Sequence, residues 1–183
     1  IGYFSNSFYF HSSMIIFCRV IELHDKDKFE IFAYDFGYHQ EDEYTKRIQI
    51  AADQYKVVRS LSDQELVNQA RKDDIDIAVD LMGYTSKNRA SIFSQKVAPI
   101  QICYLDWPGG TANPAIDYVI ADSTIIPKKD EKYYVEKIIR MSVAEQPTDD
   151  TLMKSEKVFN RSDLGINENA FVYCCFSKSE KIQ

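Results

Sequence analysis

Short apolar runs alternate with polar, helix-like segments along most of the chain. The apolar runs predict strands at residues 1–4, 29–34, 55–58, 75–82, 100–105, 118–121 and 137–141. The segments between them predict helices at residues 12–23, 41–54, 62–72 and 87–96. Strands and helices that alternate in this way are typical of right-handed βαβ units. The pattern therefore predicts an α/β fold, with a parallel sheet covered by helices on both faces.

Particular residues support the predicted ends of several helices and strands. Ser62 and Glu65 have the spacing of a capping box, in which each side chain satisfies a backbone N–H of the other residue at a helix start. Gly83 ends the apolar run before it, and Pro99 stops the helix predicted at residues 87–96. The helices and strands are thus punctuated by residues that suit their ends.

The pattern changes after Pro127. Residues 143–155 are polar and loop-like, and the apolar run at residues 171–176 predicts a new buried strand. We therefore expect a first domain at residues 1–142, a linker at 143–165 and the start of a second domain at 166–183. The chain begins with Ile1 rather than Met and ends soon after an apolar run, so we expect it to be a fragment of a longer protein.

Composition narrows the function classes. The chain has 183 residues, of which 45% are hydrophobic and 27% charged, which is ordinary for a globular protein with a core. The formal net charge is −6 and no basic cluster stands out, so nucleic acid is not an expected partner. No apolar run approaches the roughly 20 residues that span a bilayer, so no membrane is expected either.

The cysteines indicate a reducing compartment. The chain has four cysteines, and they form neither a C-x-x-C pair nor a repeated spacing. They are predicted to be buried free thiols rather than a metal site or a disulfide framework. With no signal peptide in the sequence, the expected location is cytoplasmic.

Candidate chemistry gathers where strands are predicted to end. In a doubly wound sheet, ligands collect beyond the carboxyl ends of the strands. This rule selects residues 5–12, 80–86, 105–111 and 177–181. His11 lies in the first of these segments, and a histidine can take and return a proton near neutral pH, as a general base must. From its position alone, a capping or surface role for His11 is favoured. His24 and His39 are interpreted as surface residues.

Two more segments hold residues that a plain core does not require. Asp80 lies in an apolar strand, where a lone carboxylate is costly to bury. It is followed by the glycine turn at Gly83, with Tyr84 next and Thr85 able to cap the next helix. The turn at residues 107–111 has two glycines, which permit close approach of a ligand. Neither a P-loop nor a G-x-G-x-x-G fingerprint is present, so these residues alone predict only an α/β domain that binds a ligand at its strand ends.

At these same positions the sequence resembles the catalytic region of the protein O-GlcNAc transferases, glycosyltransferase family 41, which includes the SPINDLY branch. The similarity covers nearly the whole chain in the same order and is nearest to the bacterial type. It is carried by residues 2–5, His11, 26–32, 80–85, 98–101, 108–109, 116–122, 134–137, 146–147 and 171–176.

The resemblance implies a GT-B architecture of two Rossmann-like lobes, of which this chain would supply the N-terminal lobe and the truncated start of the nucleotide-sugar-binding lobe. It implies transfer of a sugar, with inversion, from a UDP-sugar donor, most simply UDP-GlcNAc, to serine or threonine hydroxyls of a protein or peptide. Neither a metal nor another cofactor is implied. The family also often carries upstream tetratricopeptide (TPR) repeats that select acceptors.

The resemblance assigns roles to particular residues. His11 matches the histidine proposed to act near the acceptor. Lys181 matches the lysine that neutralises the donor pyrophosphate, a charge that must be stabilised as it leaves. Leu105, Pro108 and Gly109 match the turn that approaches the sugar. Asp80, Tyr84 and Thr85 are further candidates for the cleft.

The sequence also departs from the family pattern. Asp106 and Trp107 stand where the family has glycine and tyrosine, and Lys178 and Glu180 stand near the donor in place of amide and aromatic side chains. Two alternatives therefore stay open. One is a related transferase with GDP-fucose or UDP-glucose as donor, or with asparagine as acceptor. The other is a binding domain that has lost catalysis.

Overall fold

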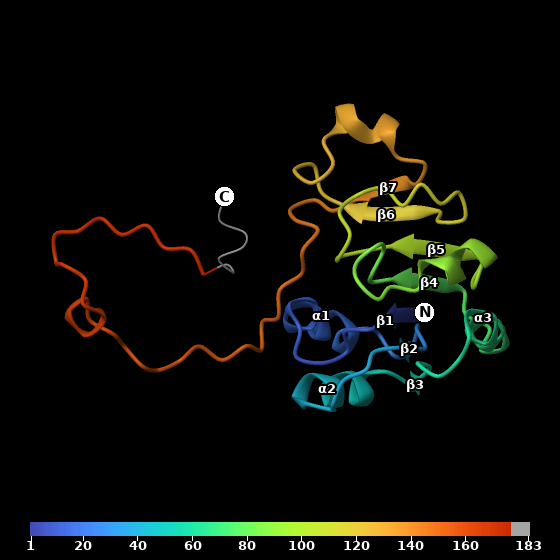
Figure 1. Ribbon diagram of the computed structural model, residues 1–183, viewed down its shortest axis with the longest axis horizontal. Helices are drawn as coiled ribbons and strands as arrows, with labels where there is room; N and C mark the ends of the chain where they lie inside the picture. The colour runs from blue at the N-terminus through green and yellow to red at the C-terminus, as the bar shows by residue number, and fades with distance from the viewer. Residues whose placement is uncertain (177–183) are drawn as a thin grey trace. The chain divides into compact units, whose positions relative to one another are not determined.

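Within residues 1–176, which the computed structural model describes, seven strands form one parallel sheet (Figure 1). They are stacked in the order β3-β2-β1-β4-β5-β6-β7. The predicted fold class is confirmed, and every strand predicted before residue 142 is present. The strands are β1 (Gly2–Ser5), β2 (Phe32–Asp35), β3 (Gln54–Val57), β4 (Ile77–Asp80), β5 (Ile100–Cys103), β6 (Tyr118–Ala121) and β7 (Lys137–Arg140).

The strand order reverses direction beside β1. Tyr3 of β1 pairs with Ala33 of β2 on one side and with Val79 of β4 on the other. The chain therefore builds the sheet outward from β1 to β3, crosses back to β4, and continues outward to β7. Where an order reverses in this way, the loops after the two central strands diverge and leave a crevice at their carboxyl ends.

Two hydrophobic cores cover the two faces of the sheet. The helices α1 (Ser12–Glu22) and α2 (Glu43–Ala51) contribute to one core, and α3 (Asp63–Lys72) and the 3-10 helix η1 (Ala90–Gln95) contribute to the other. Because successive strand residues point to opposite faces, Tyr3 enters the first core and its neighbour Phe4 enters the second. The central strands β1, β2 and β4 are therefore buried on both faces.

Polar side chains cap the starts of α1, α2 and α3. The Ser62 side chain accepts from the Glu65 backbone N–H at the start of α3, and the Glu65 carboxylate accepts from the Ser62 backbone N–H, so the predicted capping box is confirmed. Asp42 and Thr45 form a second capping box at α2. At α1 the capping residue is His11, whose Nδ1 atom faces the Ser13 backbone nitrogen.

The helix predicted at residues 87–96 is wrong in type and length. Only η1 forms there, as a 3-10 helix. Lys87 and Lys96 adopt φ angles of 59° and 56°, in the left-handed region that interrupts a right-handed helix. Farther along, the 3-10 helix η2 (Lys128–Tyr133) precedes β7. None of the described helices is long and apolar enough to cross a membrane.

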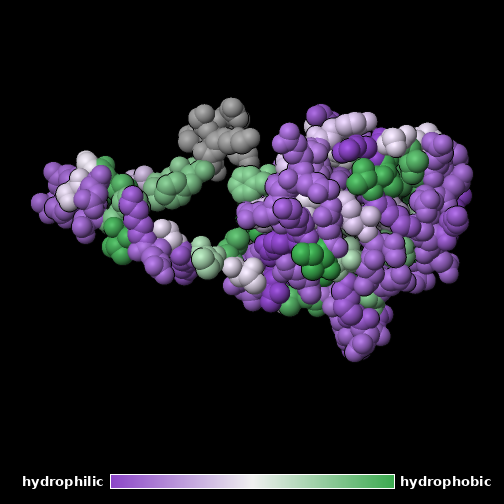
Figure 2. Space-filling model, turned by 90° about the horizontal axis from the view of Figure 1, so that it is seen from below, coloured by the Kyte–Doolittle hydropathy of each residue, from purple (hydrophilic) through white to green (hydrophobic). Residues whose placement is uncertain are grey.

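Contacts divide the chain into a compact unit at Ile1–Thr151 and a second unit at Leu152–Gln183. In residues 152–176 of the second unit, the structure shows one short element, the 3-10 helix η3 (Ser162–Leu164). The strand predicted at residues 171–176 is absent, because no segment within residues 152–176 accepts its backbone hydrogen bonds. Its hydrophobic side chains are exposed, as Figure 2 shows along the extended segment.

The cysteine prediction holds in part. All four cysteines are free, and Cys18 and Cys103 are buried in the first unit as expected. Cys174 and Cys175 are exposed instead, because they belong to the segment that packs into no core within residues 152–176.

Candidate functional site

A cleft of about 800 Å³ opens at the carboxyl ends of the central strands. The loops after β1, β2, β3, β4 and β5 all contribute to it, which is the position expected for a ligand site in a sheet of this order. Its lining includes Ser7, Tyr9, His11, Tyr38, Arg59, Met82, Thr85, Lys87 and Asp106. Residues far apart in the sequence thus meet at one edge of the sheet.

His11 lies at a helix start and on the cleft. It caps α1, with its Nδ1 atom 3.3 Å from the Ser13 backbone nitrogen, and it also lines the cleft. The same Nδ1 atom lies 2.9 Å from the Ser13 hydroxyl oxygen. Capping anchors the ring at the start of a helix, so its position in the cleft is fixed by the fold.

Asp106, on the turn after β5, lines the cleft beside His11. Its Oδ1 atom accepts a hydrogen bond of 2.5 Å from the Ser13 hydroxyl. Burial raises the pKa of the Asp106 carboxyl above its ordinary value, while the Ser13 hydrogen bond and the nearby His11 ring oppose that shift. The preceding residue, Leu105, has a φ of 83°, which only a constrained turn imposes on a leucine.

Asp80 supports the site without lining the main cleft. It is buried at the end of β4, and its Oδ1 atom accepts from the backbone nitrogens of Met82 at 2.9 Å and Gly83 at 3.1 Å. Burial raises its pKa to about 6, although both backbone N–H groups favour the charged form. The carboxyl thus holds the turn after β4, and it is not among the side chains that line the main cleft.

The turn after β5 is tied to the turn after β4. The ring of Trp107 packs directly on Gly83, so closely that a Cβ atom at position 83 would overlap it. Tyr84 meets the same ring edge-on at 5.6 Å, and its hydroxyl donates to the Thr111 carbonyl at 2.7 Å. Of the three extra cleft candidates, Thr85 lines the cleft, while Asp80 and Tyr84 support its walls.

The candidates for sugar contact lie on this second turn. Leu105 packs against the core shared with α1 and α2. Pro108 is exposed, and Gly109 lies against the Trp107 ring. None of the three lines the main cleft, so the structure places them next to His11's cleft and not inside it. Lys181 lies outside the described residues.

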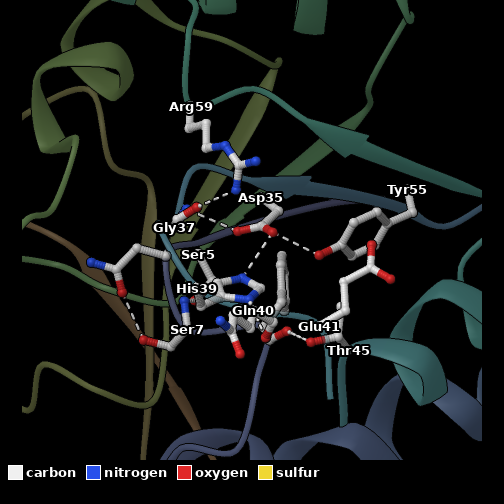
Figure 3. Close-up of polar contacts among 12 residues, drawn as sticks. Ser5, Ser7, Asp35, Gly37, His39, Gln40, Glu41, Thr45, Tyr55 and Arg59 are labelled. Carbon is white, nitrogen blue, oxygen red and sulfur yellow. Dashed lines mark hydrogen bonds and ion pairs between the residues drawn. The ribbon is translucent and has the colours of Figure 1, made fainter. Parts of the chain in front are cut away.

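A second histidine cluster was missed by the sequence analysis (Figure 3). The buried Asp35 carboxylate accepts from the His39 ring at 2.9 Å, the Tyr55 hydroxyl at 2.7 Å and the Gly37 backbone N–H at 2.8 Å. The His39 side chain is only 8% exposed, and Tyr9 stacks on its ring at 4.8 Å. The expectation that His39 is a surface residue is therefore wrong. The one available signal was its spacing, four residues after an aspartate at a strand end.

The cleft has a cationic side. Arg59 is exposed, lies over the Tyr38 ring at 5.7 Å and donates to the Gly37 carbonyl at 3.4 Å. Lys87 is exposed as well, on the loop after β4. Across residues 1–176, no group of three His, Cys, Asp or Glu side chains is placed to hold a metal ion.

Comparison with known proteins points to a single family. The family model for glycosyl transferase family 41 matches residues 1–153. A probable UDP-N-acetylglucosamine–peptide N-acetylglucosaminyltransferase, SEC, of Arabidopsis thaliana is 30% identical over all of this chain, which covers 19% of that protein. The SPINDLY protein of Arabidopsis thaliana, with the same description, is 28% identical over 77% of this chain and 16% of its own length.

A solved structure shares the fold. A mutant form of the O-GlcNAc transferase of Thermobaculum terrenum matches 80% of this chain with a TM-score of 0.76 and 31% identity. The matched part is 28% of that chain. The protein thus spans about a fifth of the length of the curated relatives described above, and about a quarter of this solved relative.

Proposed function

The chain belongs to glycosyltransferase family 41, and on this premise we propose that it is the N-terminal catalytic lobe of an inverting glycosyltransferase. The reaction is transfer of GlcNAc from UDP-GlcNAc to serine or threonine hydroxyls of a protein or peptide. The relatives named above carry this donor and acceptor in their descriptions. The observation that carries the proposal is the place of His11, on a cleft at the point where the strand order reverses.

His11 acts on the acceptor. Its Nε2 atom takes the proton from the attacking hydroxyl as the oxygen bonds to the sugar carbon opposite the leaving diphosphate, which inverts that carbon. The ring is held at the start of α1 by the hydrogen bond between Nδ1 and the Ser13 hydroxyl, so it needs no large rearrangement to meet the acceptor hydroxyl. In this proposal the acceptor hydroxyl enters the cleft of about 800 Å³ that His11 lines.

The donor lies against the turn after β5 and the second lobe. Leu105, Pro108 and Gly109 contact the sugar, and Lys181 neutralises the charge that develops on the leaving diphosphate. No metal or cofactor takes part. In this proposal the first lobe ends near residue 142, residues 143–165 form the linker, and residues 166–183 begin the nucleotide-sugar-binding lobe of a longer cytoplasmic protein.

Two observations weigh against a decayed binding domain. Asp106, the departure from the family pattern, makes a short hydrogen bond to Ser13 beside His11 and is not left without a contact. Glu136 is buried and accepts from the backbone and the hydroxyl of Thr111, which orders the turn that would meet the sugar. Both contacts support an organised site.

The test is sugar transfer by the full-length protein, with UDP-GlcNAc, UDP-glucose and GDP-fucose offered separately and cell extract as acceptor. We expect transfer from UDP-GlcNAc, lost in His11→Ala and in Lys181→Ala. Transfer from another donor alone would replace the proposed sugar. Silence with all three donors, from a folded protein, would overturn the transferase proposal in favour of a binding domain.

A further inference from the structure

A hydrogen-bonded chain runs from Asp106 through the Ser13 hydroxyl to the His11 ring. We propose that Asp106 is a positioning residue that fixes the tautomer of His11, with hydrogen on Nδ1 and the free lone pair of Nε2 facing the cleft. This inference rests on the proposed function for its purpose, although the tautomer itself can be measured without any transfer.

The donor and acceptor rules set the direction of the chain. An ionised carboxylate only accepts, so the Ser13 hydroxyl must give its single hydrogen to Asp106 across the 2.5 Å contact. The Ser13 oxygen can then only accept from the His11 ring, at 2.9 Å. Nδ1 must therefore carry a hydrogen, and in the neutral ring Nε2 is the basic nitrogen.

One contact competes with this arrangement. The Ser13 backbone nitrogen lies 3.3 Å from Nδ1 and would donate to it if Nδ1 carried no hydrogen. That contact is longer than both links of the chain and joins neutral groups. The chain ends on a carboxylate, and hydrogen bonds to charged groups are roughly twice as strong as neutral ones. The Asp106 carboxylate thus decides between two tautomers that the capping contact alone would leave open.

Burial of Ser13 and packing around Asp106 preserve these two hydrogen bonds. Ser13 is only 4% exposed, so water has little access to the central hydroxyl. On the other side, Asp106 is held by the constrained turn at Leu105, with a φ of 83°, and by the packing of Trp107 on Gly83. The carboxylate is therefore carried by a rigid turn on one element and the histidine by a helix start on another.

Protonation of Asp106 reverses the direction of the hydrogen bonds from Asp106 through Ser13 to His11. A neutral carboxyl can donate to the Ser13 oxygen, whose hydrogen then turns to Nδ1 and leaves Nε2 protonated. Burial raises the pKa of Asp106 and so brings this reversal nearer to neutral pH. The charged or titratable groups around His11 and Asp106 are Tyr9, which packs near the ring, Asp80 behind Asp106, and the cations Arg59, Lys87 and Arg89 of the cleft.

The test is nitrogen-15 NMR of the histidine rings in the 183-residue chain, at a pH where the rings are neutral. The chain has three histidines, so single His→Gln variants assign every signal. His24 is an internal control, because its Nδ1 lies 2.7 Å from the Val20 carbonyl and its Nε2 lies 3.0 Å from the Tyr3 hydroxyl. It should carry its hydrogen on Nδ1 in every variant.

We expect His11 to carry its hydrogen on Nδ1 in the wild type and mostly on Nε2 in Ser13→Ala and in Asp106→Gly. Asp106→Asn should keep the wild-type tautomer, because its amide oxygen still accepts from Ser13. Unchanged His24 and His39 signals would show that each variant is folded. A wild-type His11 with hydrogen on Nε2, or one that stays Nδ1-protonated in both Ser13→Ala and Asp106→Gly, would overturn the proposal.

Transfer assays on the full-length protein separate this inference from the proposed function. We expect kcat to fall roughly 10- to 100-fold in Ser13→Ala and Asp106→Gly, part of the 10²–10⁴ that a general base supplies. KM for the donor should change little, and the double variant should be no slower than the slower single variant. Wild-type inactivity with the expected tautomer would sink the transferase proposal and leave the positioning role standing.

Discussion

Two histidines at the same edge of the sheet are each linked to an aspartate, and the two links differ. His39 contacts the buried Asp35 directly, is nearly sealed from solvent and stacks on Tyr9. His11 reaches Asp106 only through Ser13, and its ring borders the open cleft. The same pair of chemical groups is therefore packed as structure in one place and presented to a ligand in the other.

The difference lies in what each ring nitrogen faces. Both nitrogens of His39 face acceptor oxygens, those of Asp35 and of the Gln40 backbone. Across residues 1–176, the hydrogen bonds of the His11 ring involve Nδ1 alone. Protein oxygens therefore lie against both nitrogens of the His39 ring, whereas Nε2 of His11 has no such partner within residues 1–176. We therefore expect the hydrogen bonds of Asp35 to contribute mainly to stability, and those that link His11 to Asp106 to contribute mainly to catalysis.

The largest effect on stability is expected for Asp35→Ala. The substitution removes the acceptor of three buried donors, and we expect it to lower the free energy of unfolding by about 3–5 kcal/mol. Urea denaturation of the 183-residue chain measures this. Asp27→Ala, at an exposed aspartate, should stay within about 0.5 kcal/mol of the wild type. A loss below about 1 kcal/mol at Asp35 would show that the cluster is not structural.

Asp80 should make stability depend on pH. Its pKa in the folded protein, about 6, lies above that of an unfolded aspartate. The folded state therefore holds a proton that the unfolded state has lost between about pH 4 and pH 6. The free energy of unfolding should fall by about 3 kcal/mol as pH rises through that window.

Asp80→Asn is the matched control for this pH dependence. Its amide oxygen can still accept from the backbone nitrogens of Met82 and Gly83, but it does not titrate. Denaturation curves collected from pH 4 to pH 7 should show the fall in wild type and a flatter profile in the variant. Equal slopes in both would assign the pH dependence to other groups.

A smaller effect is expected for Gly83→Ala. Gly83 has a φ of 51°, and a Cβ atom there would overlap Trp107. We expect a loss of about 2–3 kcal/mol from the left-handed backbone and the displaced ring. Because Trp107 adjoins Asp106, the variant should also disturb the His11 tautomer. This tests whether the turn after β5 supports the hydrogen bonds between Asp106, Ser13 and His11.

Gly110→Ala is the control on the neighbouring turn after β5, which also contains Trp107. A Cβ atom there would approach the Tyr134 ring no nearer than 3.2 Å, and the backbone does not need a glycine. We expect it to cost less than about 1 kcal/mol. A loss equal to that of Gly83→Ala would mean that any added side chain in these two packed turns lowers stability, and not specifically one that displaces Trp107 at position 83.

Much of the fold was predictable because its signals are local. Strands buried on both faces appear as apolar runs, so β6 was predicted at its observed limits, and the capping box at Ser62 and Glu65 needs only residues three apart. The prediction failed where distant residues decide. The helix expected at residues 87–96 is interrupted by left-handed residues at both ends, and residues 171–176 have no strand partner within residues 152–176.

The site shows the same division. His11 was singled out from its place after a strand, and the structure puts it on the cleft. Its link to Asp106 joins Ser13 to a residue 93 positions away, so no local pattern reveals it. His39 was interpreted as a surface residue because the ring that stacks on it, Tyr9, belongs to another segment. Asp106 was visible in the sequence only as a departure from the family.

The most direct test compares His11→Ala with His39→Ala by two measurements, transfer by the full-length protein and urea denaturation of the 183-residue chain. We predict that His11→Ala reduces transfer by about 10² or more and changes the free energy of unfolding by less than about 1 kcal/mol. We predict that His39→Ala lowers the free energy of unfolding by about 2 kcal/mol and leaves kcat of the folded enzyme within a few-fold. Transfer that survives in His11→Ala and disappears in folded His39→Ala would contradict the account.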